Sequence, residues 1–237
     1  MSDRFDTIDG VVGLSHGAGC CMTIGGEGLD ILQKTMAGFA RNPNFGGILV
    51  VGLGCEVNLV STFVEATRLS ESTLFKTLDI QNLGGTRQTV ARALEIIEAM
   101  LPPVASARRE PVSAEHLVLG LECGGSDAYS GITANPALGA AADLVVRNGG
   151  TVILSETPEI YGAEHLLIRR AVSRKVADKL IDKIRWWEAY TKKHDAEINN
   201  NPTPGNKEGG LTTILEKSLG AVAKAGTTNL NDVFSYA

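Results

Sequence analysis

Four apolar, strand-like segments of the sequence run directly into groups of thiols, carboxylates and an imidazole. In an open α/β sheet, ligands bind outside the carboxyl ends of the parallel strands. If the four segments are neighbouring parallel strands, we expect the polar groups to converge on one active site. The segments and the groups that follow them are residues 11–15 with His16 and Cys20, residues 47–54 with Cys55 and Glu56, residues 116–121 with Glu122, Cys123, Ser126 and Asp127, and residues 151–155 with Glu156 and Glu159.

The cysteines indicate soft-metal chemistry. Cys20, Cys55 and Cys123 follow three different apolar segments, and this wide spacing excludes a zinc finger or ribbon, which needs close pairs. Thiolates beside imidazole or carboxylate suit iron or zinc, and three cysteines with one open position also suit a hydrolyase-type iron–sulfur cluster. A lone cysteine often acts as a small hydrophobe, and we interpret Cys21 as structural.

His16 and the strand-end carboxylates are the candidates for proton transfer. His16 lies four residues before Cys20 in a glycine-containing loop, where it could ligate a metal or act as a base near neutral pH. An ordinary loop histidine fits the same spacing. A carboxyl group near a metal or a second carboxylate acquires a pKa suited to acid–base work. The acid–base candidates are His16, Glu56, Asp127 and Glu156.

Glycine-rich turns before predicted helices indicate anion binding. Helix N-termini present free N–H groups and a positive dipole end, which bind groups such as a substrate carboxylate. None of these turns matches a dinucleotide fingerprint or a Walker loop, so a nucleotide-binding protein is disfavoured. The substrate-binding candidates are Gly84, Gly85 and Thr86, Ser126 in the next turn, and Asn206 in a Pro- and Gly-rich loop.

The alternation of apolar and helical segments predicts an α/β fold. We expect a mostly parallel, Rossmann-like sheet flanked by helices on both faces, with a long C-terminal helical segment. The predicted domains are a polar tail over residues 1–10, one α/β domain over 11–228, and a linker over 229–237. The predicted strands are residues 11–15, 47–54, 74–80, 116–121 and 151–155; the helices are 86–101, ended by Pro102-Pro103, then 163–197 and 211–224, with a loop over 199–210.

Composition narrows the class of protein. The net charge of −5 and the pI near 5.4 argue against a nucleic-acid or anionic-membrane partner. No apolar run approaches the roughly 20 residues that span a bilayer, and the polar N-terminus is unlike a signal peptide. These features predict a cytoplasmic protein.

At the same residues the chain resembles the altronate and galactarate dehydratases, a family of sugar-acid dehydratases. Several motifs occur in the same order, which is more specific than any one of them. The resembling segments are His16-Gly17-Ala18-Gly19-Cys20, Gly52-Leu53-Gly54-Cys55-Glu56, Cys123-Gly124-Gly125-Ser126-Asp127, Ala134-Asn135-Pro136, Ser155-Glu156-Thr157-Pro158-Glu159, Gly162-Ala163-Glu164, Pro204-Gly205-Asn206 and Gly209-Gly210-Leu211.

The resemblance implies a hydro-lyase that converts a sugar acid such as altronate or galactarate into a 2-keto-3-deoxy acid. It also implies a divalent metal, iron first, with Mn²⁺ and an iron–sulfur cluster left open. With the residue types, it assigns Cys20, Cys55 and Cys123 to the metal. The chain resembles the middle part of the family's proteins, so the implied partners are a sugar-acid substrate, a C-terminal domain, and a small N-terminal domain or subunit.

Three alternatives remain at this point. Related proteins act on sulfonated substrates such as sulfolactate, so a sulfo-lyase that releases sulfite is the first. A non-catalytic domain that binds a metal or a sugar acid and acts as a scaffold within a longer enzyme is the second. A nucleotide-binding α/β protein is the third and weakest. The stereochemistry of the substrate and the oligomeric state, including a homo-oligomer, are left open.

Overall fold

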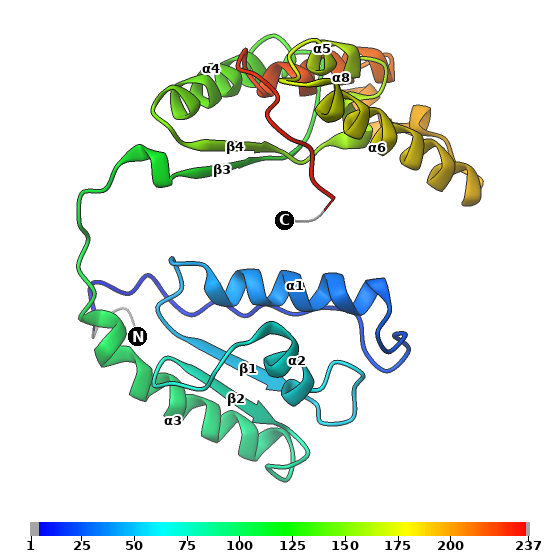
Figure 1. Cartoon of the computed structure of the whole chain (residues 1–237). Coiled ribbons are helices and arrows are strands. Elements are labelled where there is room, and N and C mark those ends of the chain that lie inside the picture. Colours follow the sequence, from blue (N-terminus) through cyan, green and yellow to red (C-terminus); the bar gives the residue numbers. More distant parts are fainter. Residues whose placement is uncertain (1–4, 236–237) are drawn as a thin grey trace. The chain divides into compact units, whose positions relative to one another are not determined.

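The computed structural model describes residues 5–235 and divides the chain into two compact units (Figure 1). Unit 1 comprises Met1–Glu110 and unit 2 comprises Pro111–Ala237. Residues 11–228 were predicted to form one domain. The structure instead has two units, because each has its own short sheet and its own helices. The α/β class is confirmed, and both strand pairs are parallel.

Unit 1 is a two-stranded parallel sheet between helices. Strands β1 and β2 pair in register from Ile48 with Phe75 to Gly52 with Asp79. Helix α3 covers one face of the sheet, and α1 and α2 lie on the other (Figure 1). The elements are α1 (Glu27–Arg41), β1 (Ile48–Gly52), α2 (Val60–Thr67), β2 (Phe75–Asp79) and α3 (Thr86–Ala105).

Two predictions for unit 1 were wrong. Residues 11–15 form no strand, although they are apolar, because no neighbouring strand pairs with them in the described structure. Helix α3 also continues through Pro102 and Pro103 to Ala105. A proline interrupts a helix through its missing N–H and its clash with the preceding turn. Here both prolines lie in the last turn, and their carbonyl groups accept hydrogen bonds from the Ser106 N–H at 3.1 and 3.3 Å.

Unit 2 contains the second parallel pair, β3 (Val118–Leu121) and β4 (Thr151–Leu154). Helices α4 (Ala134–Arg147) and α8 (Ile214–Lys224) pack together on one side of this sheet (Figure 1). On its opposite face Val118 and Ile153 are 62% and 42% exposed. The prediction of one sheet covered on both faces is therefore wrong for this strand pair.

The main hydrophobic core of unit 2 lies between α8 and several of the remaining elements. Apolar residues of α5, α6, α8 and the turn after β4 form this core, which includes Ile160, Leu167, Leu180 and Val222. The elements are η2 (Ala114–His116), η3 (Thr157–Ile160), α5 (Glu164–Ile168), α6 (Arg174–Lys193), η4 (Ile198–Asn200) and α7 (Pro204–Glu208).

The helix predicted over residues 163–197 is broken into α5 and α6. Ser173 caps the second helix, its hydroxyl group accepting a hydrogen bond from the Val176 N–H. Between the two helices, Ala171 bridges to Leu230, and the Val172 N–H donates to the Leu230 carbonyl at 3.1 Å. Long-range pairing therefore overrides a helical pattern that is continuous in the sequence.

The predicted linker over residues 229–237 is attached to unit 2 as far as it is described. Leu230 and Val233 pack against the core cluster, and Asp232 pairs with Lys179 at 2.5 Å. Residues 236–237 lie outside the described part. The predicted loop over residues 199–210 contains the short helix α7.

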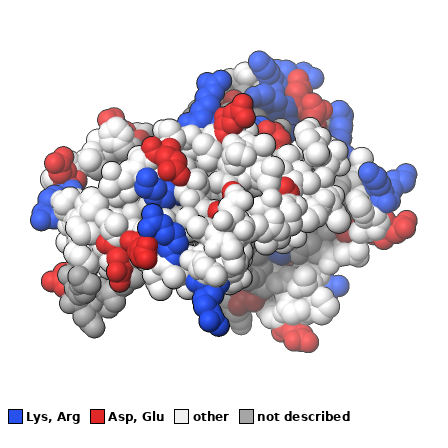
Figure 2. All heavy atoms as spheres, turned by 90° about the horizontal axis from the view of Figure 1, so that it is seen from below, with Lys and Arg blue, Asp and Glu red and all other residues white. Residues whose placement is uncertain are grey.

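Charges of both signs are dispersed over the surface. Figure 2 shows one face on which basic and acidic side chains lie around neutral surface. Within the described residues, no helix is long and apolar enough to cross a membrane.

Candidate functional site

In unit 1, the His16–Cys20 loop lies against the loop that follows β1. The Cys20 Sγ atom is 3.6 Å from the Cys55 carbonyl oxygen, and both thiols are exposed. The preceding segment is irregular and not a strand, so a loop brings His16 and Cys20 to this edge of the sheet. The structure thus brings together two of the three predicted metal ligands on adjacent loops.

Glu56 folds back over the end of β1. The Leu53 N–H donates to Glu56 Oε1 at 2.7 Å. Gly52 permits this position, because a Cβ there would lie 2.9 Å from Glu56 Oε1 and 2.5 Å from a methyl group of Val60. Glu56 and His16 line the same hollow, together with Asn58. Its volume of about 20 Å³ suits a water-sized group and not a sugar acid.

Asp79 is a carboxylate at this edge that the sequence analysis missed. It ends β2 and pairs in register with Gly52. Its Oδ2 accepts a hydrogen bond from Asn82 at 3.1 Å, whereas its buried Oδ1 has no hydrogen-bond partner among the described residues. A Cβ on Gly52 would lie 3.1 Å from that oxygen, so Asp79 and Glu56 approach the same point of β1. Its place at the end of a strand was the available sequence signal.

The predicted anion-binding turn follows β2. Gly84 and Gly85 have φ angles of +82° and +114°, which side-chain-bearing residues rarely adopt. Thr86 begins α3 directly after them. Because β1 and β2 are parallel, this helix N-terminus starts from the same edge of the sheet as Cys55 and Glu56. Substrate binding there stays a prediction.

In unit 2, Cys123, Ser126 and Asp127 lie in the turn that follows β3. The Cys123 Sγ and Ser126 Oγ atoms are 3.3 Å apart, and the thiol is half-buried. Asp127 Oδ1 accepts hydrogen bonds from the N–H groups of Tyr129 and Ser130 at 2.9 and 2.7 Å. These bonds make Asp127 the residue that closes the turn. Its predicted acid–base role remains untested, and one of its two oxygens is already occupied.

Asn206 is held within unit 2 by its own hydrogen bonds. Its Nδ2 donates to the Ser126 carbonyl at 2.9 Å, and its Oδ1 accepts from the Thr203 N–H at 3.0 Å. Thr203 in turn caps α7, so the two side chains form a capping box. Substrate binding by Asn206 also stays a prediction.

Behind this turn, unit 2 buries two lysine–glutamate pairs. Glu156 Oε1 pairs with Lys224, and both side chains are almost fully buried. Glu159 Oε1 lies 3.0 Å from Lys217 Nζ and accepts from Asn201 Nδ2 at 3.2 Å. Glu156 was predicted to act on substrate. Its side chain is enclosed and paired with Lys224, and its predicted acid–base role stays a prediction.

The environment moves the pKa values of the two glutamates apart. Burial raises the pKa of Glu156, and the neighbouring Glu159 carboxylate raises it further, against the opposing effect of Lys224. Burial also favours the neutral form of Glu159, but the hydrogen bond and positive charge of Lys217 outweigh it and lower the pKa of that carboxyl. Glu159 is therefore the anion to which Lys217 is bound.

Lys217 and Lys224 are buried, paired lysines that the sequence analysis missed. They lie seven residues apart, which places both on one face of α8. That face also carries the core residue Ala221. Lysines at helical spacing with a buried apolar residue are unexpected unless they are paired, and this was the signal available in the sequence.

The predicted site residues divide between the two units. Unit 1 contains His16, Cys20, Cys55, Glu56, Gly84, Gly85 and Thr86, and unit 2 contains Cys123, Ser126, Asp127, Glu156 and Asn206. Among residues 5–235, no three His, Cys, Asp or Glu side chains gather closely enough to hold a metal. The three-cysteine ligand set and the metal itself remain predictions.

The comparisons with known proteins match both units. Residues 1–105 match the family described as D-galactarate dehydratase/altronate hydrolase, second domain. Residues 114–237 match D-galactarate/altronate dehydratase, C-terminal. The gap between the two matches coincides with the boundary between the units. The second match differs from the prediction that the chain lacks the whole C-terminal part.

Individual relatives agree with this assignment. The chain is 39% identical over 230 residues to an altronate dehydratase of Bacillus subtilis (strain 168), covering 97% of the chain and 45% of that protein. It is 39% identical over 209 residues to the galactarate dehydratase (L-threo-forming) of Escherichia coli (strain K12), covering 85% and 40%. A third relative is the (2R)-sulfolactate sulfo-lyase subunit beta of Chromohalobacter salexigens, which is 31% identical over 223 residues, covering 93% and 56%.

The chain therefore spans about half the length of the curated relatives it matches. Matches of both units to this one family, with 38–39% identity to three of its dehydratases, establish the relationship. The chain belongs to the galactarate and altronate dehydratase family.

Proposed function

We propose that this protein is a lyase that removes water from a sugar acid of the altronate or galactarate class. The observation that carries the proposal is that both units, and not one of them, match the family and its dehydratases. The position of thiols, carboxylates and an imidazole beyond the carboxyl ends of β1, β2 and β3 supports it, since ligands of α/β folds bind at this edge.

The elimination of water requires two proton transfers, and tautomerisation of its product adds a third, at carbon 3. A base removes the proton on carbon 2, next to the carboxylate, while an acid protonates the hydroxyl group that leaves carbon 3 as water. The enol that results takes a proton at carbon 3 and becomes the 2-keto-3-deoxy acid. Binding of the substrate carboxylate by positive groups or free N–H groups stabilises the charge that develops on it.

We assign the proton transfers to His16 and Glu56. They line the same hollow in unit 1, and an imidazole can accept or donate a proton near neutral pH. Thr86 and the following N–H groups of α3, at the same edge of the sheet, are assigned to the substrate carboxylate. Glu156 is not assigned to the reaction, because its side chain is enclosed beside Lys224.

A divalent metal, with iron first, is proposed from the family resemblance alone. The metal would polarise the substrate as a Lewis acid. Within the described residues the donors do not form a three-ligand set in either unit, so no step above is assigned to a metal. Anaerobic metal and acid-labile sulfide analysis tests the proposal. Iron without sulfide indicates a mononuclear site, iron with sulfide indicates a cluster, and no metal after reconstitution with ferrous iron contradicts it.

The function is tested with a panel of sugar acids. The purified chain is incubated anaerobically with altronate, galactarate and their stereoisomers, with and without ferrous iron, and the 2-keto-3-deoxy product is measured colorimetrically. We expect product from at least one acid, and a loss of roughly 100-fold or more in kcat/KM for His16→Gln and for Glu56→Gln. The control is Glu71→Gln, in an exposed pair away from this edge. Absence of product from every acid would contradict the proposal.

A second candidate function has a specific observation in its favour. The sulfo-lyase relative, at 31% identity, acts on (2R)-sulfolactate according to its name. Elimination of sulfite also begins with loss of the proton next to a carboxylate, so the same base would serve. Sulfite release from sulfolactate, without keto-deoxy product from sugar acids, would favour this alternative over dehydration.

A further inference from the structure

Helix α7 and the residues around it contact the turn over residues 123–128 at two points. Asn206 Nδ2 donates to the Ser126 carbonyl at 2.9 Å. The Ala128 N–H donates to the Gly209 carbonyl at 2.9 Å. One bond therefore comes from a side chain and the other from the main chain, and together they fix both ends of the segment from Ser126 to Ala128.

Two glycines permit this close approach. A Cβ on Gly209 would lie 2.9 Å from the Cβ of Asp127. A Cβ on Gly210, whose φ angle is +97°, would lie 2.8 Å from the Cβ of Ala128. Side chains at either position would push the turn away, so the sequence around α7 is fitted to the turn.

Lys217 holds α7 from the other side. Its Nζ lies 2.7 Å from Asn201 Oδ1, 3.0 Å from Glu159 Oε1 and 3.5 Å from Asn206 Oδ1. Only 6% of Lys217 is exposed, so water cannot replace these partners. The ammonium group thus connects the buried Glu159 carboxylate to the same Asn206 side chain that binds the turn.

We infer that Asn206 and Lys217 are positioning residues that fix the turn carrying Cys123. The side-chain oxygen of Asn206 accepts hydrogen bonds from Thr203 and Lys217, and the side-chain nitrogen donates one to the Ser126 carbonyl group. Asn206 fixes the position of Ser126, and Ser126 in turn contacts the thiol, with its Oγ 3.3 Å from Cys123 Sγ. The inference deepens the proposed function, and rests on it only for the assignment of the carboxyl end of β3 to the active site.

The test measures the Cys123 thiol alone. Cys20, Cys21 and Cys55 are exposed and are replaced by Ser, so that iodoacetamide reports on Cys123. In this background, Asn206→Asp keeps the oxygen that accepts from Thr203 and Lys217 but replaces the donor to Ser126 with an oxygen. Asn199→Ala, an exposed residue a few positions away, is the matched control. Amide hydrogen exchange over residues 123–130 is measured in parallel.

We expect Asn206→Asp to raise both the alkylation rate of Cys123 and the amide exchange of the turn by roughly fivefold or more, the effect of one lost hydrogen bond on a local opening equilibrium. Urea unfolding followed by the fluorescence of Trp186 and Trp187, which lie on α6 outside the turn, checks that unit 2 is folded in the variant. Rates equal to those of Asn199→Ala within twofold would overturn the role of Asn206.

Lys217 is tested by the double variant Lys217→Met with Glu159→Gln. Removal of both charges leaves no unpaired buried carboxylate, so the variant is expected to fold. It should accelerate alkylation of Cys123 as Asn206→Asp does. Release of the turn by Asn206→Asp and not by the double variant would overturn the role of Lys217. Neither result depends on enzymatic activity, so failure here and failure of the proposed function are distinguishable.

Discussion

The two units place their polar residues in opposite ways. In unit 2 the buried polar residues include Asp143, Glu156, Lys217 and Lys224. Lys224 pairs with Glu156, and Lys217 pairs with the half-buried Glu159. In the described part of unit 1 the buried polar residues are the neutral Asn58 and Thr89. The chemistry-bearing groups of unit 1, among them Cys20 and Cys55, are exposed on loops.

The comparison shows that unit 2 holds its charged side chains in fixed, buried positions, whereas unit 1 leaves its reactive side chains accessible to solvent. Burial of two ion pairs costs desolvation free energy, and such pairs persist where their geometry satisfies the charges and fixes one arrangement. In unit 2, the Lys217–Glu159 pair is connected through Asn206 to the turn that carries Cys123. Unit 1 leaves its thiols and imidazole open to small molecules, and it relies on short loops at the end of β1 to hold them.

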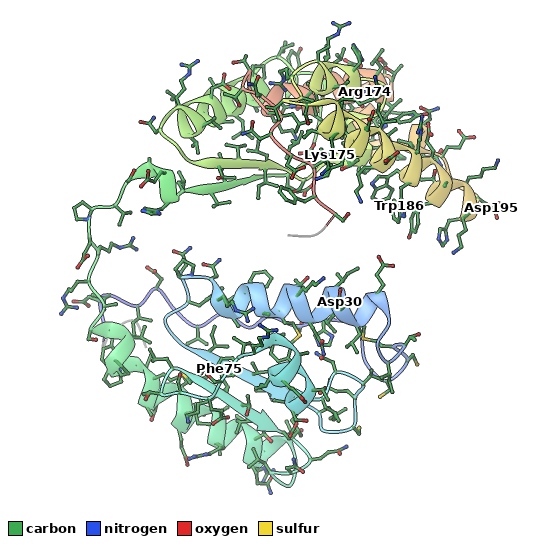
Figure 3. All side chains as sticks on the ribbon, viewed as in Figure 1. Asp30, Phe75, Arg174, Lys175, Trp186 and Asp195 are labelled. Atoms are coloured by element: carbon green, nitrogen blue, oxygen red, sulfur yellow. The ribbon has the colours of Figure 1, made fainter. Side chains whose placement is uncertain are left out.

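The strongest test of the comparison removes a buried charge from unit 2. Lys224→Met leaves the enclosed Glu156 carboxylate without its partner, and we expect a loss of about 3–5 kcal/mol in the free energy of unfolding. Urea unfolding followed by tryptophan fluorescence measures it, because both tryptophans lie on α6 of unit 2 (Trp186 is labelled in Figure 3).

The control for this prediction is Lys76→Met in unit 1. Its pair with Glu71 is largely exposed, at 3.5 Å, and exposed pairs contribute about 0–1 kcal/mol. Urea unfolding followed by circular dichroism covers unit 1, which has no tryptophan. If the two variants lost equal free energies of unfolding, the buried pair would contribute no more than a surface pair, and the contrast between the units would be wrong.

A smaller effect is expected from the packing of α4 against α8. A Cβ on Gly139 would lie 2.1 Å from the Ala223 carbonyl oxygen, so Gly139→Ala must separate the helices. We expect a loss of about 1–3 kcal/mol, typical of overpacking. Gly38→Ala on α1 of unit 1 is the matched control, since a Cβ there meets nothing within 4 Å.

Gly38→Ala should stabilise unit 1 by about 0.5–1 kcal/mol, because alanine has less backbone freedom to lose in a helix interior. Circular dichroism melting of the two variants measures both changes. The interpretation of α4 and α8 as closely fitted would be wrong if Gly139→Ala were as stable as the parent chain.

The smallest destabilisation that we predict depends on pH. Hydrogen bonds from the Thr227 hydroxyl and N–H groups, both 2.7 Å long, lower the pKa of Asp143 below its usual value. A carboxylate with a depressed pKa stabilises the fold above its unfolded pKa of about 4, and this contribution is lost as the pH falls through the folded pKa. Asp143→Asn should therefore cost about 1–2 kcal/mol at pH 7 and less below pH 4.

Urea unfolding at pH 7 and at pH 3 measures this difference. If Asp143→Asn lost the same free energy at both pH values, the ionised carboxylate would not be the source of its stability. The control variant is Arg147→Gln. The charge of Arg147 lowers the pKa of Asp143 less than the Thr227 hydrogen bonds do, so this variant should leave the pH dependence nearly unchanged.

The sequence predicted the elements better than their partners. Apolar runs are local, so four strands and the start of α3 at Thr86 were found close to their observed bounds. Pairing depends on residues distant in the chain, so the sequence did not reveal two separate sheets, the break at Ala171, or the packing of Leu230. Residues 11–15 have the composition of a strand, but no neighbouring strand among the described residues pairs with them, and they are irregular.

The same limit applies to the site. The motifs identified Cys123 as a metal ligand and Ser126 and Asn206 as substrate-binding residues, without linking the three, and the structure places them close together. Motif spacing did not identify Lys217 or Asp79, because both lie outside the motifs, and their weaker signals were the helical spacing of the lysines and a position at a strand end. Glu156 was found by position, but its burial beside Lys224 was not visible in the sequence.

The central claim, dehydration through an enol, is tested most directly by carrying out the reaction in deuterium oxide. The chain is incubated anaerobically with altronate or galactarate and ferrous iron, and the product is examined by mass spectrometry. We predict a 2-keto-3-deoxy acid that has lost one water and carries one deuterium at carbon 3, because the enol takes its last proton from solvent. Unchanged substrate, or a product without deuterium at carbon 3, would contradict the account.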